Sequence, residues 1–283
     1  MTRAFVLSGG ASLGAVQVGM LKALAGHGIL PDRVYGSSAG AVNAAWVAGD
    51  PRLEHLDELD RLWVGLRTRT VFPAHPVRGL LGFLGRENSL VSSGSLRRLL
   101  QRQVRFTRLE DAAIPIGIPV TEVTTGREEM LRTGDAVQAV LASAAIPGVF
   151  PPVTIDGRAF IDGSIVNNVP IEPAVEDGAT EIWVLATGYA CNLERPPHGA
   201  LAMILHAVSL LVQQRLIRDV EEFGERVALR VIPPLCPLDV SPADFSQARA
   251  LIDRAEAAAN AWIDHLDPHV GVEQARDLGF HRH

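Results

Sequence analysis

Apolar and polar positions along the chain form two alternating patterns. Short apolar runs, such as residues 4–7, are each followed by a longer stretch in which apolar residues recur at intervals. In the first of these stretches, Val16, Met20 and Leu24 recur at helical spacing, which predicts a helix. Alternation of this kind is typical of a largely parallel sheet that is covered on both faces. We therefore predict an α/β fold, a three-layer sandwich with a mostly parallel central sheet.

The expected elements fill most of the chain. The middle, residues 65–95, is expected to be irregular, and all motifs are expected to lie in a single domain spanning residues 1–283. The motif-bearing part covers about 4–190 and a helical C-terminal part about 198–283. Strands are predicted at 4–7, 33–36, 116–124, 129–132, 152–162, 181–186 and 227–232, and helices at 15–26, 40–48, 95–104, 135–143, 200–223 and 245–266.

A serine lies in a turn of small residues between a predicted strand and a predicted helix. Residues 36–40 read Gly-Ser-Ser-Ala-Gly, which fits the Gly-x-Ser-x-Gly pattern of a tight strand-to-helix turn. Such a turn brings two backbones into contact, so a Cβ at Gly36 or Gly40 would collide. Ser38 would stand at the N-terminus of the following helix, where developing negative charge is stabilised. Alone, the pattern is equally typical of an ordinary helix start.

A glycine-rich loop follows the first strand, where residues 7–14 read Leu-Ser-Gly-Gly-Ala-Ser-Leu-Gly. The unpaired backbone N–H groups of a loop between a strand and a helix suit an anion. A phosphate loop would need Gly-Lys-Ser/Thr, and a dinucleotide loop would need glycine where Ala11 stands. The oxyanion of an acyl-transfer reaction fits better, because Ser38 begins the next strand-helix unit.

A carboxylate ends a later apolar run. Residues 160–170 read Phe-Ile-Asp-Gly-Ser-Ile-Val-Asn-Asn-Val-Pro, which places Asp162 at a glycine turn followed by two asparagines that can fix loop backbone. An isolated Asp-Gly pair is more often a surface turn between strands. Upstream, however, residues 142–152 join a helix end to an apolar, proline-rich stretch that is too hydrophobic for an exposed loop.

Together, these segments resemble the patatin-like phospholipase family. The resemblance rests on the loop at 8–14, the turn at 36–40 and the block at 142–170, whose order and spacing agree over roughly residues 4–190. It implies a three-layer α/β fold and a Ser38–Asp162 dyad that hydrolyses acyl esters of lipids without metal or cofactor. In that dyad Asp162 takes the proton of Ser38 directly. The resemblance also implies oxyanion donors at Gly9, Gly10, Ala11 and Ala39, and turns shaped by Gly36, Gly40, Gly14 and Gly163.

Three positions depart from the family pattern. Ala11 replaces a usual glycine, Leu13 replaces a usual basic residue, and Ser164 stands where a second glycine is common. Without a cation at position 13 the mouth of the site is more apolar, which predicts a preference for uncharged esters over phospholipids. The alternative is that Leu13 only packs the first helix against the sheet.

Two other functions stay open. A Ser-His-Asp esterase of the common α/β-hydrolase fold would need a late histidine, and His206, His265 and His269 are available. That fold, however, places several strands before its nucleophile, whereas Ser38 comes early. A catalytically silent protein that binds an anion or a lipid is the second alternative. The presence of Ser38 and Asp162 counts against it, whereas the departures at Ala11 and Leu13 give it some support.

Composition limits the partners and the cellular location that the chain is expected to have. With 47% apolar and 20% charged residues the chain can bury a large core, and a net charge of −6 gives no reason to expect nucleic acid as a partner. The two cysteines, Cys191 and Cys236, form no disulfide framework, so we expect free thiols. No signal peptide is visible, which predicts a cytoplasmic protein. The sequence does not specify an oligomeric state.

Residues 71–84 are apolar yet rich in proline and glycine. They could form a lid that makes transient contact with a membrane surface, or a connection buried against the core. The apolar stretch at 200–212 is too short to span a bilayer, and its continuation predicts a long amphipathic helix.

Overall fold

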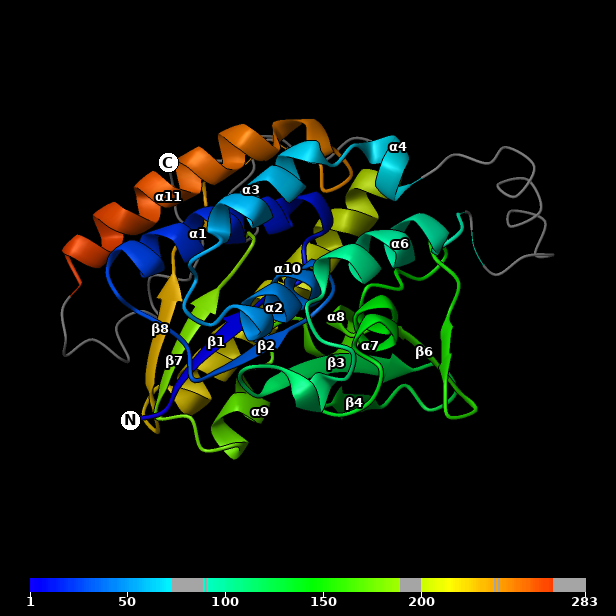
Figure 1. Ribbon diagram of the computed structural model, residues 1–283, viewed down its shortest axis with the longest axis horizontal. Coiled ribbons are helices and arrows are strands. Elements are labelled where there is room, and N and C mark those ends of the chain that lie inside the picture. Colours follow the sequence, from blue (N-terminus) through cyan, green and yellow to red (C-terminus); the bar gives the residue numbers. More distant parts are fainter. Residues whose placement is uncertain (73–88, 90, 189–199, 237, 239, 267–283) are drawn as a thin grey trace.

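A mixed β-sheet forms the centre of the molecule, with helices on both faces (Figure 1). The computed structural model describes residues 1–72, 89, 91–188, 200–236, 238 and 240–266. The sheet order is β5-β6-β3-β2-β1-β7-β8, with β4 also paired to β3. The parallel strands are β1 (Arg3–Leu7), β2 (Arg33–Gly36), β3 (Ile116–Glu122), β7 (Glu181–Leu185) and β8 (Ala228–Ile232), and the antiparallel ones are β4 (Glu128–Leu131), β5 (Val153–Ile155) and β6 (Arg158–Asp162).

The two faces of β1 are buried in different hydrophobic clusters, which makes the fold three-layered. Phe5 and Leu7 belong to the cluster of α1 and α2, whereas Ala4 and Val6 belong to the cluster of α9 and α10. The predicted α/β sandwich with a mostly parallel centre is therefore confirmed. The first face carries α1 (Gly14–Gly26), α2 (Ala39–Gly49), α3 (Leu56–Gly65), α6 (Gly94–Gln103), α7 (Ala136–Ser143) and α11 (Ala248–Asp264), and the second carries α9 (Ile171–Glu176) and α10 (Ala200–Phe223).

Several elements of the fold are only one turn long. They are the single-turn helices α4 (Thr68–Val71) and α8 (Ser164–Asn167), and the 3₁₀ turns η1 (Ala11–Leu13), η2 (Leu109–Asp111) and η3 (Phe245–Gln247).

The register of β1 and β2 brings two of the sequence motifs together. The strands are parallel and pair Leu7 with Gly36, so the glycine-rich loop and the serine turn leave the sheet side by side. Ser37 N–H donates to the Leu7 carbonyl (3.1 Å), which continues this contact beyond the strands. Both motifs thus lie at the carboxyl end of the parallel strands.

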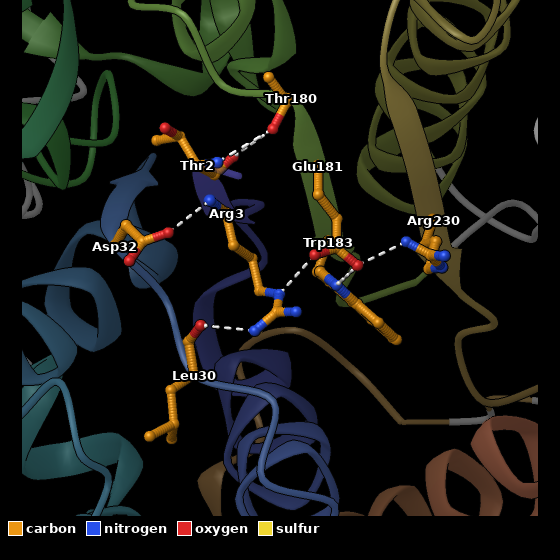
Figure 2. A network of polar contacts seen from close by, with 8 residues as sticks. All are labelled: Thr2, Arg3, Leu30, Asp32, Thr180, Glu181, Trp183 and Arg230. Atoms are coloured by element: carbon orange, nitrogen blue, oxygen red, sulfur yellow. Dashed lines mark hydrogen bonds and ion pairs between the residues drawn. The ribbon is translucent and has the colours of Figure 1, made fainter. Parts of the chain in front are cut away.

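The opposite, amino-terminal edge of the sheet is held by a buried ionic cluster (Figure 2). Glu181 on β7 is 4% exposed and accepts from Arg3 on β1 (Nε to Oε2, 2.6 Å). Its other oxygen, Oε1, accepts from Arg230 on β8 (2.5 Å) and from the indole N–H of Trp183 (3.0 Å). One carboxylate therefore ties three neighbouring strands together.

Most predicted elements are present, two of them differ in detail, and helices α3, α4, α8 and α9 lie where no helix is predicted. The strand predicted at 152–162 is the hairpin β5–β6, because Asp156 and Gly157 both have positive φ (49° and 78°) and form a tight turn. The helix predicted at 245–266 begins with the turn η3 before α11. Helix α3 was not predicted, and it lies just before the segment expected to be irregular.

Three further expectations have different outcomes. Cys236 is disulfide-bonded, so the expectation of a free thiol is wrong there; whether two thiols meet depends on tertiary spacing, which composition does not reveal. None of the described helices has the length and apolarity needed to cross a membrane. Of the segment at 71–84, residues 73–84 lie outside the described residues.

Candidate active site

Ser38 occupies a strained position between β2 and α2. Its φ is 53°, a value that side-chain-bearing residues rarely adopt and that costs on the order of 1–3 kcal/mol. The turn depends on its glycines: an added Cβ at Gly36 would lie 2.2 Å from the Gly40 carbonyl oxygen, and one at Gly40 would lie 2.3 Å from the Leu7 carbonyl oxygen. The close backbone contact predicted for this turn is confirmed.

The Ser38 hydroxyl donates a hydrogen bond to Oδ2 of Asp162 (2.7 Å). The two residues are 5% and 2% exposed. Asp162 is the last residue of β6, which pairs with β3 and places Val120 opposite it. An added Cβ at Gly163 would lie 2.0 Å from the Pro119 carbonyl oxygen, so the turn after Asp162 also requires glycine.

The other carboxylate oxygen of Asp162 is held by Ser164. Oδ1 accepts from the Ser164 amide (2.9 Å) and from the Ser164 hydroxyl (2.7 Å). Burial raises the pKa of Asp162 to about 6, although the hydrogen bonds from Ser164 and Ser38 act in the opposite direction. A carboxyl group in this state is ionised at neutral pH and is more basic than an ordinary aspartate.

The end of α7 accepts hydrogen bonds from the backbone around both Ser38 and Asp162. The Ser143 hydroxyl accepts from the Ser38 amide (3.1 Å), and its carbonyl accepts from the Gly163 amide (3.3 Å). The Ala145 carbonyl accepts from the Asp162 amide (3.0 Å). The block at 142–170 therefore acts as one unit around the pair. The sequence indicated this block, but nothing in it pointed to Ser143 in particular.

The glycine-rich loop lies against both residues. Asn168 binds the Gly9 amide through its side-chain oxygen (3.0 Å) and its carbonyl (3.3 Å), which confirms that an asparagine after Asp162 fixes loop backbone. Because the Gly9 amide is already paired, it is not the free donor for the oxyanion that the resemblance implied, and Gly9 instead shapes the loop. Among the described residues, no hydrogen-bond acceptor is assigned to the amides of Gly10, Ala11 or Ala39.

Two contacts explain the shape of that loop. Thr187, after β7, donates its hydroxyl to the Gly9 carbonyl (2.6 Å), and a Cβ at Gly10 would lie 2.3 Å from the same hydroxyl. Ala11 has φ 50°, so the alanine that replaces the family's usual glycine adopts a conformation that glycine favours. No sequence motif points to Thr187.

An apolar pocket opens beside Ser38. It contains about 550 Å³ of empty space, including a part open to solvent, and both Ala11 and Ala39 line it. Its wall comes from α2, α3, α4, α6, the loop after α7, and η3; it includes Val42, Leu62, Phe72, Leu96, Phe150 and Phe245.

A buried polar chain braces the helices behind this pocket. The Trp63 indole N–H donates to Asn43 (2.8 Å), and Asn43 donates to Gln17 (2.8 Å). Gln17 in turn donates to the carbonyls of Ser8 and Leu185 (2.8 and 2.9 Å). A Cβ at Gly14 would lie 2.4 Å from the Trp63 ring, so Gly14 permits this packing.

Leu13 is a core residue and not part of the pocket beside Ser38. It is 9% exposed, belongs to the hydrophobic core and is not among the described residues that line the pocket. The structure therefore favours the interpretation that Leu13 packs α1 against the sheet, and we derive no head-group preference from it.

The described histidines make their polar contacts elsewhere. His27 contacts Asn260 and Asp264, His55 contacts Asp50, and His265 contacts the Ala261 carbonyl. None of these three histidines hydrogen bonds to Ser38 or Asp162, whereas the side chain of His206 and the whole of His269 lie outside the described part of the chain. Among the described residues, no group of acidic, histidine or cysteine side chains could hold a metal ion.

Comparison with known proteins identifies the class of protein that this fold and site define. The sequence model described as patatin-like phospholipase matches residues 5–175. The chain belongs to the patatin-like phospholipase family.

Several curated relatives are much longer proteins. The chain is 31% identical over 191 residues to lysophospholipase NTE1 of Cryptococcus neoformans, covering 65% of this chain and 11% of that protein. It is 27% identical over 189 residues to human patatin-like phospholipase domain-containing protein 6, covering 66% and 13%. The chain thus spans about an eighth of the length of these relatives.

Among solved structures, VipD from Legionella pneumophila aligns with a TM-score of 0.46 at 15% identity, covering 98% of this chain and 67% of that one.

Proposed function

We propose that the protein hydrolyses acyl esters of lipids, with Ser38 as nucleophile and Asp162 as general base. The observation that carries this proposal is the 2.7 Å hydrogen bond from the Ser38 hydroxyl to a buried carboxylate. A serine hydroxyl is a weak nucleophile unless a base lies within hydrogen-bond reach. Asp162 meets that condition, and its raised pKa makes it a better proton acceptor than an exposed aspartate.

The proposed reaction has two halves. Asp162 takes the Ser38 proton as the oxygen attacks the ester carbonyl, and the proton then passes to the leaving alcohol. A water molecule next attacks the acyl-enzyme, with Asp162 again accepting the proton. Asp162 then gives this proton to the Ser38 oxygen as the fatty acid leaves, which regenerates the serine hydroxyl and the ionised base. Both halves pass through a tetrahedral oxyanion.

We assign the oxyanion to the amides of Gly10, Ala11 and Ala39. They belong to the loop and the helix start on either side of Ser38, and Ala39 begins α2, whose N-terminus favours negative charge. One donor of this kind contributes about 3 kcal/mol to transition-state stability.

The pocket supports an acyl chain as the bound group. Its wall is aliphatic and aromatic, and Ser38 lies at its edge. Burial of each methylene contributes about 0.8 kcal/mol, so a fatty-acyl chain would supply most of the binding energy. The names of the relatives, lysophospholipase and patatin-like phospholipase, agree with a lipid ester as substrate. Transient contact of residues 71–84 with a lipid surface remains part of this proposal.

Release of fatty acid tests the proposal. The purified protein is incubated with a lysophosphatidylcholine, a diacyl phosphatidylcholine and a monoacylglycerol that share one acyl chain, with the Ser38→Ala variant as the blank. We expect Ser38-dependent release from at least one of them. If the wild type equals the blank on all three and on p-nitrophenyl esters, the protein is a silent binding protein and the proposal is wrong.

A further inference from the structure

Ser164 makes two of the three hydrogen bonds that described residues donate to the Asp162 carboxylate. Its amide and its hydroxyl both donate to Oδ1, at 2.9 and 2.7 Å, while Ser38 donates to Oδ2. The amide would be present with any residue except proline, but the hydroxyl is present only because position 164 is serine. Glycine, which is common there in the family, would lack it.

The surroundings of Asp162 give this hydroxyl particular weight. Among the described residues, the side chains that hydrogen bond to Asp162 from neighbouring elements are uncharged: Ser38 at the start of α2, and Thr121 on β3, whose hydroxyl donates to the Asp162 carbonyl (2.9 Å). The pKa of Asp162 reflects burial opposed by hydrogen bonds from Ser164 and Ser38, with no described charged group among its causes. Without a cation, hydrogen-bond donors are what keep a buried carboxylate ionised.

The position of Ser164 also restricts how the carboxylate can turn. Ser164 begins α8 directly after the Gly163 turn, and an added Cβ at Gly9 would lie 3.2 Å from the Ser164 Cβ. The serine is therefore packed between the Asp162 turn and the glycine-rich loop. With Oδ1 fixed from this side, Oδ2 faces Ser38.

We propose that Ser164 is a positioning residue for the hydrolysis: its hydroxyl fixes Oδ1 of Asp162, which aims Oδ2 at Ser38 and keeps the base ionised at lower pH. This inference rests on the proposed function and goes beyond it, because it assigns the acid limit of activity to one hydroxyl group. As the pH falls, a chain with glycine at position 164 would lose its activity at a higher pH than this protein does.

The test is the pH profile of kcat/KM for a p-nitrophenyl ester, with four variants beside the wild type. Ser164→Ala and Ser164→Gly remove the hydroxyl and keep the amide, and Ser164→Thr keeps both. Thr125→Val is the matched control, because the Thr125 hydroxyl also donates to a carboxylate, Oε2 of Glu122 (2.7 Å), at an exposed turn that belongs neither to the dyad nor to the pocket wall. Circular dichroism checks the fold of each protein.

We expect the acid limb to move up by about one pH unit in Ser164→Ala and Ser164→Gly, because a hydrogen bond to a charged group is worth about that much in pKa. Ser164→Thr should keep the limb near the wild-type position, and Thr125→Val should match the wild type throughout. An unmoved limb in Ser164→Ala overturns the proposal, as does a loss of activity that is equal at every pH.

Two other outcomes are separable. If Ser164→Ala and Ser164→Gly both fail to fold, Ser164 has a structural role and the proposal is overturned. If the wild type neither hydrolyses the ester nor reacts with a fluorophosphonate, the proposed function fails and the role of Ser164 fails with it. An active wild type with an unmoved limb removes only the role of Ser164.

Discussion

Asp162 and Glu181 are both buried carboxylates, and they lie at opposite ends of one sheet with different partners. Glu181 is held between two guanidinium groups and an indole N–H (Figure 2). Asp162, in contrast, accepts from the hydroxyls of Ser38 and Ser164 and from one amide among the residues that the structure describes. The first set of partners neutralises the charge, and the second leaves a carboxylate that can accept a proton.

The difference separates a structural end from a reactive end. At the amino-terminal edge, Glu181 joins β1, β7 and β8, whose register the ion pairs fix. At the carboxyl edge, burial raises the pKa of Asp162 to about 6 and a strained Ser38 points toward it. Raised pKa values and backbone strain are typical of functional sites, and Ser38 and Asp162 combine the two in one hydrogen-bonded pair.

The largest effect is expected from the reactive end. Ser38→Ala and Asp162→Asn should each lower kcat/KM for p-nitrophenyl esters by about 10⁴-fold, because nucleophile and base act as a unit. The double variant should be no worse than either single one. The same assay on single His→Gln variants serves as the control: a folded histidine variant with an equal loss would instead support a Ser-His-Asp triad.

Glu181→Gln should lower the stability of the protein and leave its activity unchanged. Removing the charge leaves Arg3 and Arg230 without their shared partner, and both are partly exposed, so we expect a loss of about 2 kcal/mol in the free energy of unfolding. Urea denaturation measures it, with Glu225→Gln at an exposed position as the matched control. A kcat reduced tenfold or more in the folded variant would contradict the separation of the two ends.

Asp162→Asn should make the protein more stable at pH 8 than the wild type. The folded wild type keeps the Asp162 proton up to about pH 6, whereas an ordinary aspartate loses it near 3.8. Its folded state therefore binds more protons between these values, and its stability falls as the pH rises through this window. The neutral amide has no such dependence. Thermal unfolding should show a gain on the order of 1–3 kcal/mol at pH 8 that disappears below pH 4.

A gain restricted to low pH, or none at pH 8, would mean that Asp162 is not destabilised by its burial. The partial loss of its hydrogen bonds in the variant works against the gain, so a positive result is informative.

The smallest effect is expected at Ala11. Its φ of 50° is unfavourable for alanine, so Ala11→Gly should relieve strain and raise the free energy of unfolding by up to about 1 kcal/mol. Ala25→Gly in α1, where glycine is unfavourable, should lower it by a similar amount. If both substitutions destabilise equally, the loop at Ala11 is not strained.

The sequence predicted the parts of the site that depend on local backbone. Gly36 and Gly40 mark a turn that only glycine permits, and the apolar runs before it mark buried strands. Parallel pairing of β1 and β2 then brings the two loops together. Asp162 was predicted through the family resemblance, since its Asp-Gly pair alone is typical of a surface turn.

The parts that depend on tertiary contacts were not predictable in this way. Ser143 and Thr187 are ordinary residues in the sequence, and their roles come from the helix end and the strand end that place them. The paired state of the Gly9 amide depends on Asn168, which is far away along the chain. Helix α3 could have been found, because Leu56, Leu59 and Trp63 recur at helical spacing and are buried.

The most direct test of the central claim is labelling with a fluorophosphonate followed by mass spectrometry of the peptides. Wild-type protein should take up one label per chain, on Ser38, and Asp162→Asn should react at least about 100-fold more slowly while keeping its fold. A label on another serine, or an equal rate in wild type and Asp162→Asn, would contradict the assignment of Ser38 and Asp162 as nucleophile and base.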